Sequence, residues 1–239
     1  MNPIGFSTGA LALGDFRIAL EYLRRKPIDV VELSALRVHE LPKLLQAVPS
    51  LDFQQFKYIA LHAPSSMGPV EESEIVRLLA EFPRNWMIVL HPDTIHDPRL
   101  WESFGGRLAL ENMDRRKADG RTSVELFRWF SLLPEAKFCF DLAHAQQWDT
   151  TMTEAYTLLE SFAERIVQVH ISQLDSASHH YPLSSSSLRA FSEVASFIPD
   201  RVPVIIESRI AEGGIDEEVE KVEELLGTSR AVISQPVPA

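Results

Sequence analysis

The chain has 239 residues, of which 45% are hydrophobic and 24% are charged, and this composition predicts one soluble domain with a sizeable apolar core. Acidic residues outnumber basic residues by 34 to 23, and the resulting formal charge of −11 argues against a broad binding surface for DNA, RNA or anionic membranes. The single cysteine, Cys139, excludes an intrachain disulfide and a cysteine-rich zinc module, so a bound metal must use histidines and carboxylates.

Eight short runs rich in Ile, Val, Leu and Phe alternate with longer amphipathic segments, which is typical of parallel strands alternating with helices. The runs cover residues 4–7, 30–33, 58–62, 86–91, 108–111, 137–141, 166–170 and 202–207. They begin about 28 residues apart on average, the length of one strand and its helical crossover. Eight such units predict a single (β/α)8 TIM barrel. A doubly wound sheet fits the first five units equally well, but no glycine-rich phosphate turn follows the first strand.

Two of the intervening helices carry clear capping signals. Asp15 is expected to cap a helix over 16–26, and Thr122 or Ser123 a helix over 124–133. We expect the barrel domain to occupy residues 1–227 and the proline-containing tail 228–239 to be frayed. Residues 1–20 lack a secretory pattern and no apolar run approaches the roughly 18 residues of a membrane span, so a cytoplasmic protein is expected.

Six consecutive predicted strands end in a residue that can bind a metal ion. These residues are His62, His91, Glu111, Asp141, His170 and Glu207. The strands of a barrel end at one rim, where active sites form, and imidazoles with carboxylates suit Zn2+, Mn2+ or Fe2+. Each residue alone has a structural alternative: His91 before Pro92 can cap a loop, and Asp141 or Glu207 can cap a helix or join an ion pair. Their six equivalent positions favour a metal site.

With these residues, the chain from residue 4 to about 210 resembles the xylose isomerase-like barrel superfamily. This superfamily includes sugar isomerases and epimerases, and also endonuclease IV-type repair enzymes. For the sugar enzymes, the resemblance implies a metal-binding core at Glu111, Asp141, His170 and Glu207.

For the endonuclease-type members, the resemblance implies four further ligands. They are His62, His91, His144 in the Asp-Leu-Ala-His motif, and His180 in His-Tyr-Pro-Leu. Ser178 replaces the aspartate expected two residues before His180, and serines at 184–187 replace a glycine-rich stretch. These differences argue against a third ion, so one or two divalent ions per chain are expected.

The same residues serve two chemistries. A bridging Glu111 would hold two ions about 3.5–4 Å apart, which suits hydrolysis of a phosphoester. With one ion, Glu111 and Glu207 would face opposite sides of a carbon that loses and regains a proton, as isomerisation or epimerisation requires.

Further side chains near the rim are candidates for binding substrate. Arg115, Arg116 and Lys117 follow the fifth strand and Arg209 follows the eighth, and their cations suit a phosphate or carboxylate; a solvated loop is the alternative for the first three.

For two further residues, a role in substrate binding and a purely structural role are both possible. Glu32 ends the second strand and would orient substrate hydroxyls or pair with Arg37. Trp148 would form a wall for a sugar ring or pack against a helix.

The superfamily's small acidic members favour a metal-dependent isomerase or epimerase of a sugar, sugar phosphate or polyol. The alternative is an endonuclease IV-like phosphoester hydrolase with a small substrate, which the four additional histidines favour. A catalytically silent metal-binding or ligand-binding barrel is the second alternative, for which Ser178 is the hint. We expect a small-molecule partner and no nucleic acid or membrane, and the oligomeric state stays open.

Overall fold

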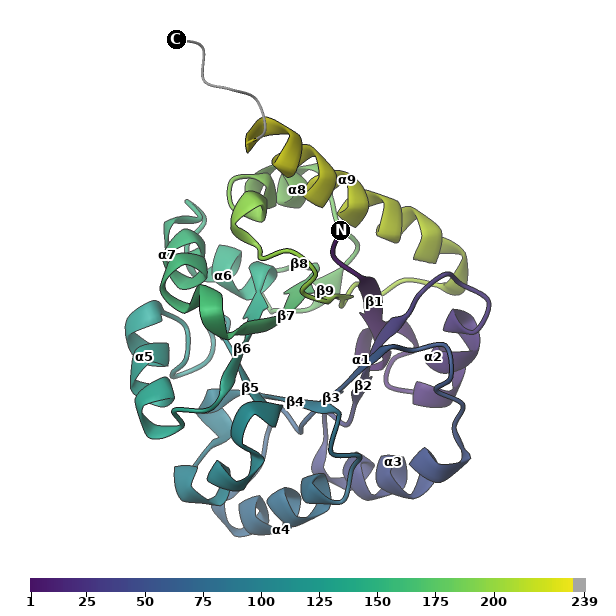
Figure 1. The fold of residues 1–239 in the computed structure, drawn as a ribbon, viewed down its shortest axis with the longest axis vertical. Coiled ribbons are helices and arrows are strands. Elements are labelled where there is room, and N and C mark those ends of the chain that lie inside the picture. Colours follow the sequence, from purple (N-terminus) through teal and green to yellow (C-terminus); the bar gives the residue numbers. More distant parts are fainter. Residues whose placement is uncertain (234–239) are drawn as a thin grey trace.

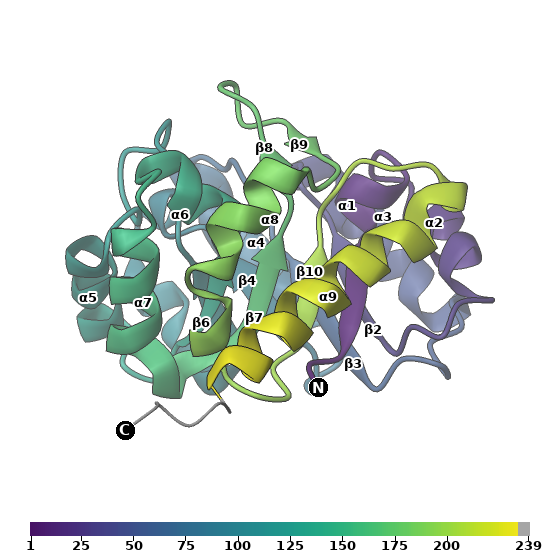
Figure 2. The same cartoon turned by 90° about the horizontal axis from the view of Figure 1, so that it is seen from above.

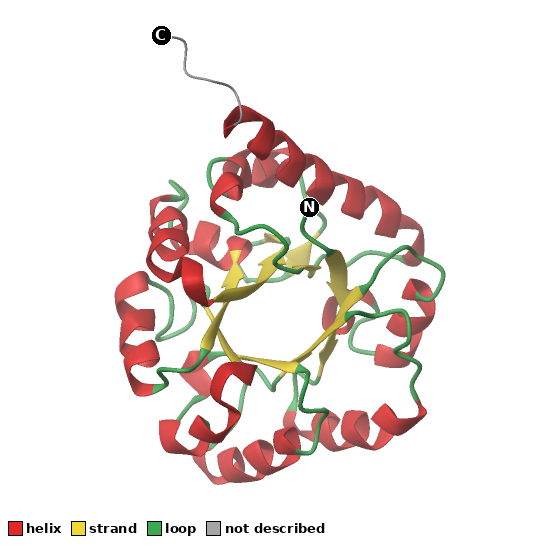
Figure 3. Ribbon diagram, in the orientation of Figure 1, coloured by secondary structure: helices red, strands yellow, loops and turns green. Residues whose placement is uncertain are grey.

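Eight parallel strands close into a barrel surrounded by helices, which confirms the predicted single (β/α)8 fold (Figures 1 and 3). The computed structural model describes residues 1–233, with side chains described at 1–69 and 71–227. The barrel strands are β1 Ile4–Ser7, β2 Val30–Ser34, β3 Tyr58–His62, β4 Met87–Leu90, β5 Leu108–Glu111, β6 Lys137–Asp141, β7 Ile166–Ile171 and β10 Val204–Ile206. Each strand pairs with its predecessor in the barrel, and β10 pairs with β1 to close it.

Most of the α-helices surround the barrel (Figure 1). The α-helices are α1 Thr8–Leu11, α2 Phe16–Leu23, α3 Leu41–Ala47, α4 Pro69–Ala80, α5 Ser123–Leu132, α6 Leu142–Trp148, α7 Thr153–Phe162, α8 Ser185–Ser192 and α9 Ile215–Ile233. Helix α1 differs from the others, because it contributes Gly9 and Ala10 to the cavity at the mouth of the barrel. Between β4 and β5 the described chain forms only short 3-10 turns. After β7, the short strands β8 Gln173–Leu174 and β9 His180–Tyr181 form a hairpin beyond the carboxyl ends of the barrel strands (Figure 2).

The predicted caps are present, while some boundaries differ. Asp15 accepts hydrogen bonds from two backbone N–H groups at the start of α2, and Thr122 accepts one at the start of α5. Helix α9 continues to Ile233, so the boundary expected at 227 falls inside it, and residues 234–239 lie outside the described residues. No helix in the described part of the chain is long and apolar enough to cross a membrane.

Successive side chains of the barrel strands pack alternately outside and inside the barrel, and so form two separate clusters. Leu61, Leu90 and Leu110 belong to the large core between strands and helices, whereas the preceding residues belong to a small cluster with Cys139. That cluster, Ala60, Val89, Ala109 and Cys139, fills the barrel interior. Because side chains of a strand alternate between its two faces, the residues two positions beyond this cluster point inward again at the mouth. Those residues are His62, His91, Glu111 and Asp141.

Candidate metal centre

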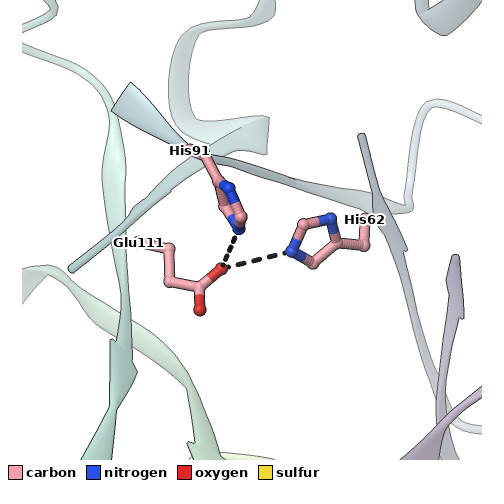
Figure 4. A group of neighbouring side chains, drawn as sticks. All are labelled: His62, His91 and Glu111. Atoms are coloured by element: carbon pink, nitrogen blue, oxygen red, sulfur yellow. Dashed lines mark hydrogen bonds and ion pairs between the residues drawn. The ribbon is translucent and has the colours of Figure 1, made fainter. Parts of the chain in front are cut away.

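The ends of β3, β4 and β5 bring His62, His91 and Glu111 together at the mouth of the barrel (Figure 4). Glu111 Oε2 lies 3.2 Å from His62 Nε2 and 3.3 Å from His91 Nε2. All three side chains are at least nine-tenths buried. We call these residues the first ligand group.

A second ligand group consists of Glu111, Asp141, His170 and Glu207. His170 Nδ1 lies 3.3 Å from Glu111 Oε1 and 3.6 Å from Glu207 Oε2. Asp141 Oδ2 lies 3.9 Å from the same nitrogen. In each group one atom per residue lies within 4.8 Å of the corresponding atoms of the others, close enough for all of them to contact one cation.

Glu111 belongs to both groups and turns a different oxygen to each. Its Oε2 faces the imidazoles of His62 and His91, and its Oε1 faces His170. A carboxylate in this position can bridge two ions, as two-metal sites require. The structure therefore brings the other five residues of the predicted rim together around the Glu111 carboxylate.

Some buried polar atoms of this site have no hydrogen-bond partner within the described part of the chain. Asp141 Oδ2 and His91 Nδ1 are buried without a hydrogen-bond partner among the described residues. Burial, together with the charge of Glu111, raises the pKa of Asp141 to about 6 and that of Glu207 to about 7. Burial also lowers the pKa of His91 to about 4, which favours the neutral imidazole that binds metals. Buried carboxylates beside neutral imidazoles fit divalent cations such as Zn2+, Mn2+ or Fe2+.

Metal binding is expected to release protons at pH 7. Burial opposes the charged form of His62, but the hydrogen bond to Glu111 and the charges of Glu32 and Glu111 outweigh it and raise its pKa to about 9. Since a ligating imidazole is neutral, the metal-free protein must lose this proton when the ion binds, and affinity should fall as the pH falls. Calorimetric titrations with Zn2+ in buffers of different ionisation enthalpy measure the release. A heat of binding that is the same in every buffer would contradict this prediction.

His144 and His180 lie beside the two groups without completing a third. His144 Nδ1 is 2.9 Å from the Asn112 carbonyl and 3.1 Å from Glu111 Oε1, while His180 Nδ1 is 2.9 Å from Ser172 Oγ. Their ring centroids are 6.3 Å apart. Ser178 Oγ forms hydrogen bonds with the Gln147 side chain. Among the described residues, no third set of three ligands includes His144 or His180.

Glu32 lies beneath the metal centre, inside the barrel, and neither of its expected roles fits. Its Oε2 accepts hydrogen bonds from Gln168 Nε2 at 2.6 Å and from the Nε2 of His170 at 3.0 Å. Arg37 pairs instead with Glu40. The Tyr58 hydroxyl donates to Gln168 Oε1 at 2.8 Å, so a buried chain of polar groups leads to the second ligand group. A carboxylate that accepts the far N–H of a ligating histidine fixes its tautomer and orientation.

Glu32→Gln is therefore expected to weaken metal binding at the second group. Loss of such an outer partner typically costs about 10- to 100-fold in affinity, because the imidazole is less basic and less well oriented. Competition with a chromogenic chelator measures this change. Tyr58→Phe is the control, since it removes a hydroxyl from Gln168 and leaves the Glu32 contact with His170 in place. Equal affinity of Glu32→Gln and the native protein would show that Glu32 does not support the ligand.

A cavity of about 320 Å³ opens above the ligands. Arg116, Lys117 and Arg209 line it together with Glu111 and Glu207. Arg115 does not line it; its guanidinium donates to the Ser176 carbonyl at 3.3 Å.

Trp148 does not line this cavity either, and the structure does not support a sugar-stacking role for it. The Arg121 guanidinium lies 4.6 Å from the centre of its ring, and the side chain is exposed at the end of α6. Trp148 therefore forms a local cation–π contact.

Comparison with known proteins supports the fold. No protein-family model and no curated protein sequence matches the chain. The structure is similar to that of IolI with a bound zinc atom, with a TM-score of 0.66, 14% identity, and coverage of 95% of this chain and 99% of IolI. It is similar to endonuclease IV from Thermus thermophilus, with a TM-score of 0.58, 17% identity, and coverage of 96% of this chain and 99% of that chain.

A third similar structure is a proposed sugar phosphate isomerase/epimerase from Anabaena variabilis, with a TM-score of 0.58, 15% identity, and coverage of 92% of this chain and 88% of that chain. At these identities the likeness concerns the fold. The comparisons therefore support the barrel fold, and the chemistry depends on the site.

Proposed function

Because the chain has the fold of the xylose isomerase-like barrels, we propose that it is a metal-dependent enzyme that hydrolyses a phosphoester of a small molecule. The observation that supports this proposal is Glu111, whose two oxygens face two different ligand groups. Among the described side chains, this carboxylate is the one ion-pair partner of the buried imidazoles of His62 and His91. A site for a single ion has no need of them.

In this proposal, His62 and His91 would hold one ion, Asp141, His170 and Glu207 would hold another, and Glu111 would contact both. Two ions so placed supply Lewis-acid activation of water and stabilise the attacking and leaving oxygens. In the hydrolysis, a water oxygen would bond to phosphorus as the bond from phosphorus to the ester oxygen breaks, and the departing alkoxide would take up the proton that the attacking water loses. The chain's residues keep the ligands rigid, since they lie on strand ends and are supported from beneath through Glu32.

We rank the hydrolase ahead of the isomerase or epimerase, which is the leading hypothesis from the sequence alone. Isomerisation or epimerisation remains the second candidate, because Glu111 and Glu207 approach His170 from different strands, at 3.3 Å and 3.6 Å. One ion at the second group would leave these carboxylates beside a chelated substrate. Proton transfer between them is the chemistry that such a site supports.

Turnover assays separate these functions. Native protein loaded with Zn2+ or Mn2+ is expected to release phosphate from one or more small phosphate esters in a screen. Exchange of deuterium from solvent into aldoses, ketoses and their phosphates, followed by NMR, reports the second candidate. Exchange without phosphate release would refute the hydrolase, and metal binding with neither reaction across both screens would favour a silent binding barrel.

Duplex DNA is expected to bind poorly. Its affinity for proteins depends on cations that displace several counterions, and here several exposed arginines pair with neighbouring carboxylates. Arg24 pairs with Glu21, and Arg77 pairs with Glu74. Titration with labelled duplex, with and without an abasic lesion, measures this affinity. Submicromolar binding at physiological salt, or cleavage at the lesion, would replace the small substrate with a nucleic acid.

A further inference from the structure

The cavity has a carboxylate-rich floor and a cationic rim. Glu111 on the floor is 1% exposed, whereas the side chains of Lys117 and Arg116 on the rim are 23% and 50% exposed. Arg209 is also exposed and lines the same cavity from the segment after β10. Cations from two separate loops therefore line the cavity that also contains the ligands. We call Arg116, Lys117 and Arg209 the cationic rim.

Two members of the rim are held by carboxylates of the fold. Lys117 Nζ lies 3.0 Å from Asp93 Oδ2, and the Arg116 guanidinium lies 3.2 Å from Asp114 Oδ2. Asp114 is 2% exposed, so its position is set by the barrel. These pairs reduce the net charge of the two cations but fix where they stand, which lowers the entropy lost when an anion binds.

Arg209 differs from them because no carboxylate among the described side chains pairs with it. Its backbone is nevertheless anchored. The Glu207 N–H donates to the Ile171 carbonyl at 2.9 Å, and the Ser208 hydroxyl donates to buried Glu218. Arg209 is thus an exposed guanidinium without a carboxylate partner among the described side chains, on an anchored segment of a chain whose formal charge is −11.

We infer that the cationic rim binds a phosphate group on the part of the substrate that does not react, with Arg209 as its main contact. A guanidinium matches two phosphate oxygens with two N–H donors, and a lysine adds a point charge. The cavity, at the low end of the roughly 300–1,000 Å³ usual for ligand pockets, fits a compact molecule. The substrate class is then a small phosphoester with a second, terminal phosphate. This assignment rests on the proposed function for the reacting end only.

Three ligands with one carbon skeleton test the rim by calorimetry: glycerol 3-phosphate, glycerate and glycerol. Metal-free protein is used, so that no bound metal ion can hold the phosphate. We expect glycerol 3-phosphate to bind most tightly, and Arg209→Gln to weaken it by about 10- to 100-fold, the usual range for a charge-assisted contact. Arg189→Gln, which makes the same change on exposed α8, should leave the affinity unchanged.

The outcomes separate this inference from the proposed function. Unchanged affinity in Arg209→Gln, or glycerate bound as tightly as glycerol 3-phosphate, would overturn the phosphate site. Binding that depends on Arg209, in a protein that releases no phosphate from any ester, would support the rim and refute the hydrolase. Phosphate release by the native protein, with an affinity for glycerol 3-phosphate that does not depend on Arg209, would support the hydrolase and refute the phosphate site at the rim.

Discussion

Glu111→Gln is expected to remove both metal ions and, with them, phosphate release. Glutamine keeps the shape of the side chain, but it lacks the charge and the second strong oxygen ligand. Because each oxygen of Glu111 faces a different ligand group, one substitution weakens both sites. The loss of affinity should exceed the roughly 10- to 100-fold that outer partners of a metal ligand cost. Elemental analysis of purified, reconstituted protein gives the metal content, and a phosphate assay gives the rate.

The surface variant Glu164→Gln provides the matched control, since its carboxylate is exposed and far along the chain from the rim. Thermal unfolding of both variants shows whether they fold. A folded Glu111→Gln protein that retains two ions would show that this carboxylate does not bridge them.

The double substitution of His62 and His91 by Ala is expected to remove one ion per chain and leave the other. The two histidines belong only to the first ligand group. Asp141, His170 and Glu207 of the second group are unchanged and can still bind an ion. An ion that stabilises charge in a transition state contributes several kcal/mol, so phosphate release should fall by about 1,000-fold or more. Metal content and rate are measured on the same preparation.

This double variant also separates the two candidate chemistries. If the protein is an isomerase or epimerase, one ion at the second group suffices, and exchange of substrate hydrogen with solvent should survive. Normal phosphate release by a variant that has lost an ion would contradict the two-ion hydrolase. Retention of two ions would show that the first group is not a metal site.

The strand ends could be predicted from sequence because a polar residue that closes an apolar run is visible in one dimension. His62, Glu111 and Asp141 each end such a run, and parallel strands of a barrel must deliver these residues to one rim. The separation of the residues into two groups that share Glu111 depends on side-chain directions, which the sequence pattern does not contain.

Glu32 shows why depth within the barrel was harder to predict. The second strand continues to Ser34, one residue beyond its expected end, and Ser34 stands in register with His62. Glu32 is in register with Ala60, so it lies two residues below the mouth. The signal that could have shown this is Gln168, two residues before His170 on the same strand face, because a buried glutamine needs a polar partner.

The roles of the loop residues also required the structure. Arg115 and Arg116 are neighbours in sequence, but the turn in which Asp114 accepts the Arg116 N–H sends only Arg116 to the cavity. Trp148 ends α6 and lies against Arg121, which comes from the loop between β5 and α5.

Anomalous diffraction at the zinc edge, from crystals of the Zn2+-loaded protein, tests the two-ion centre most directly. We expect two peaks on opposite sides of the Glu111 carboxylate, about 3.5–4 Å apart, one beside His62 and His91 and the other beside Asp141, His170 and Glu207. A single peak at the second group, with His62 and His91 free of metal, would contradict the two-ion centre and restore the isomerase or epimerase as the leading function.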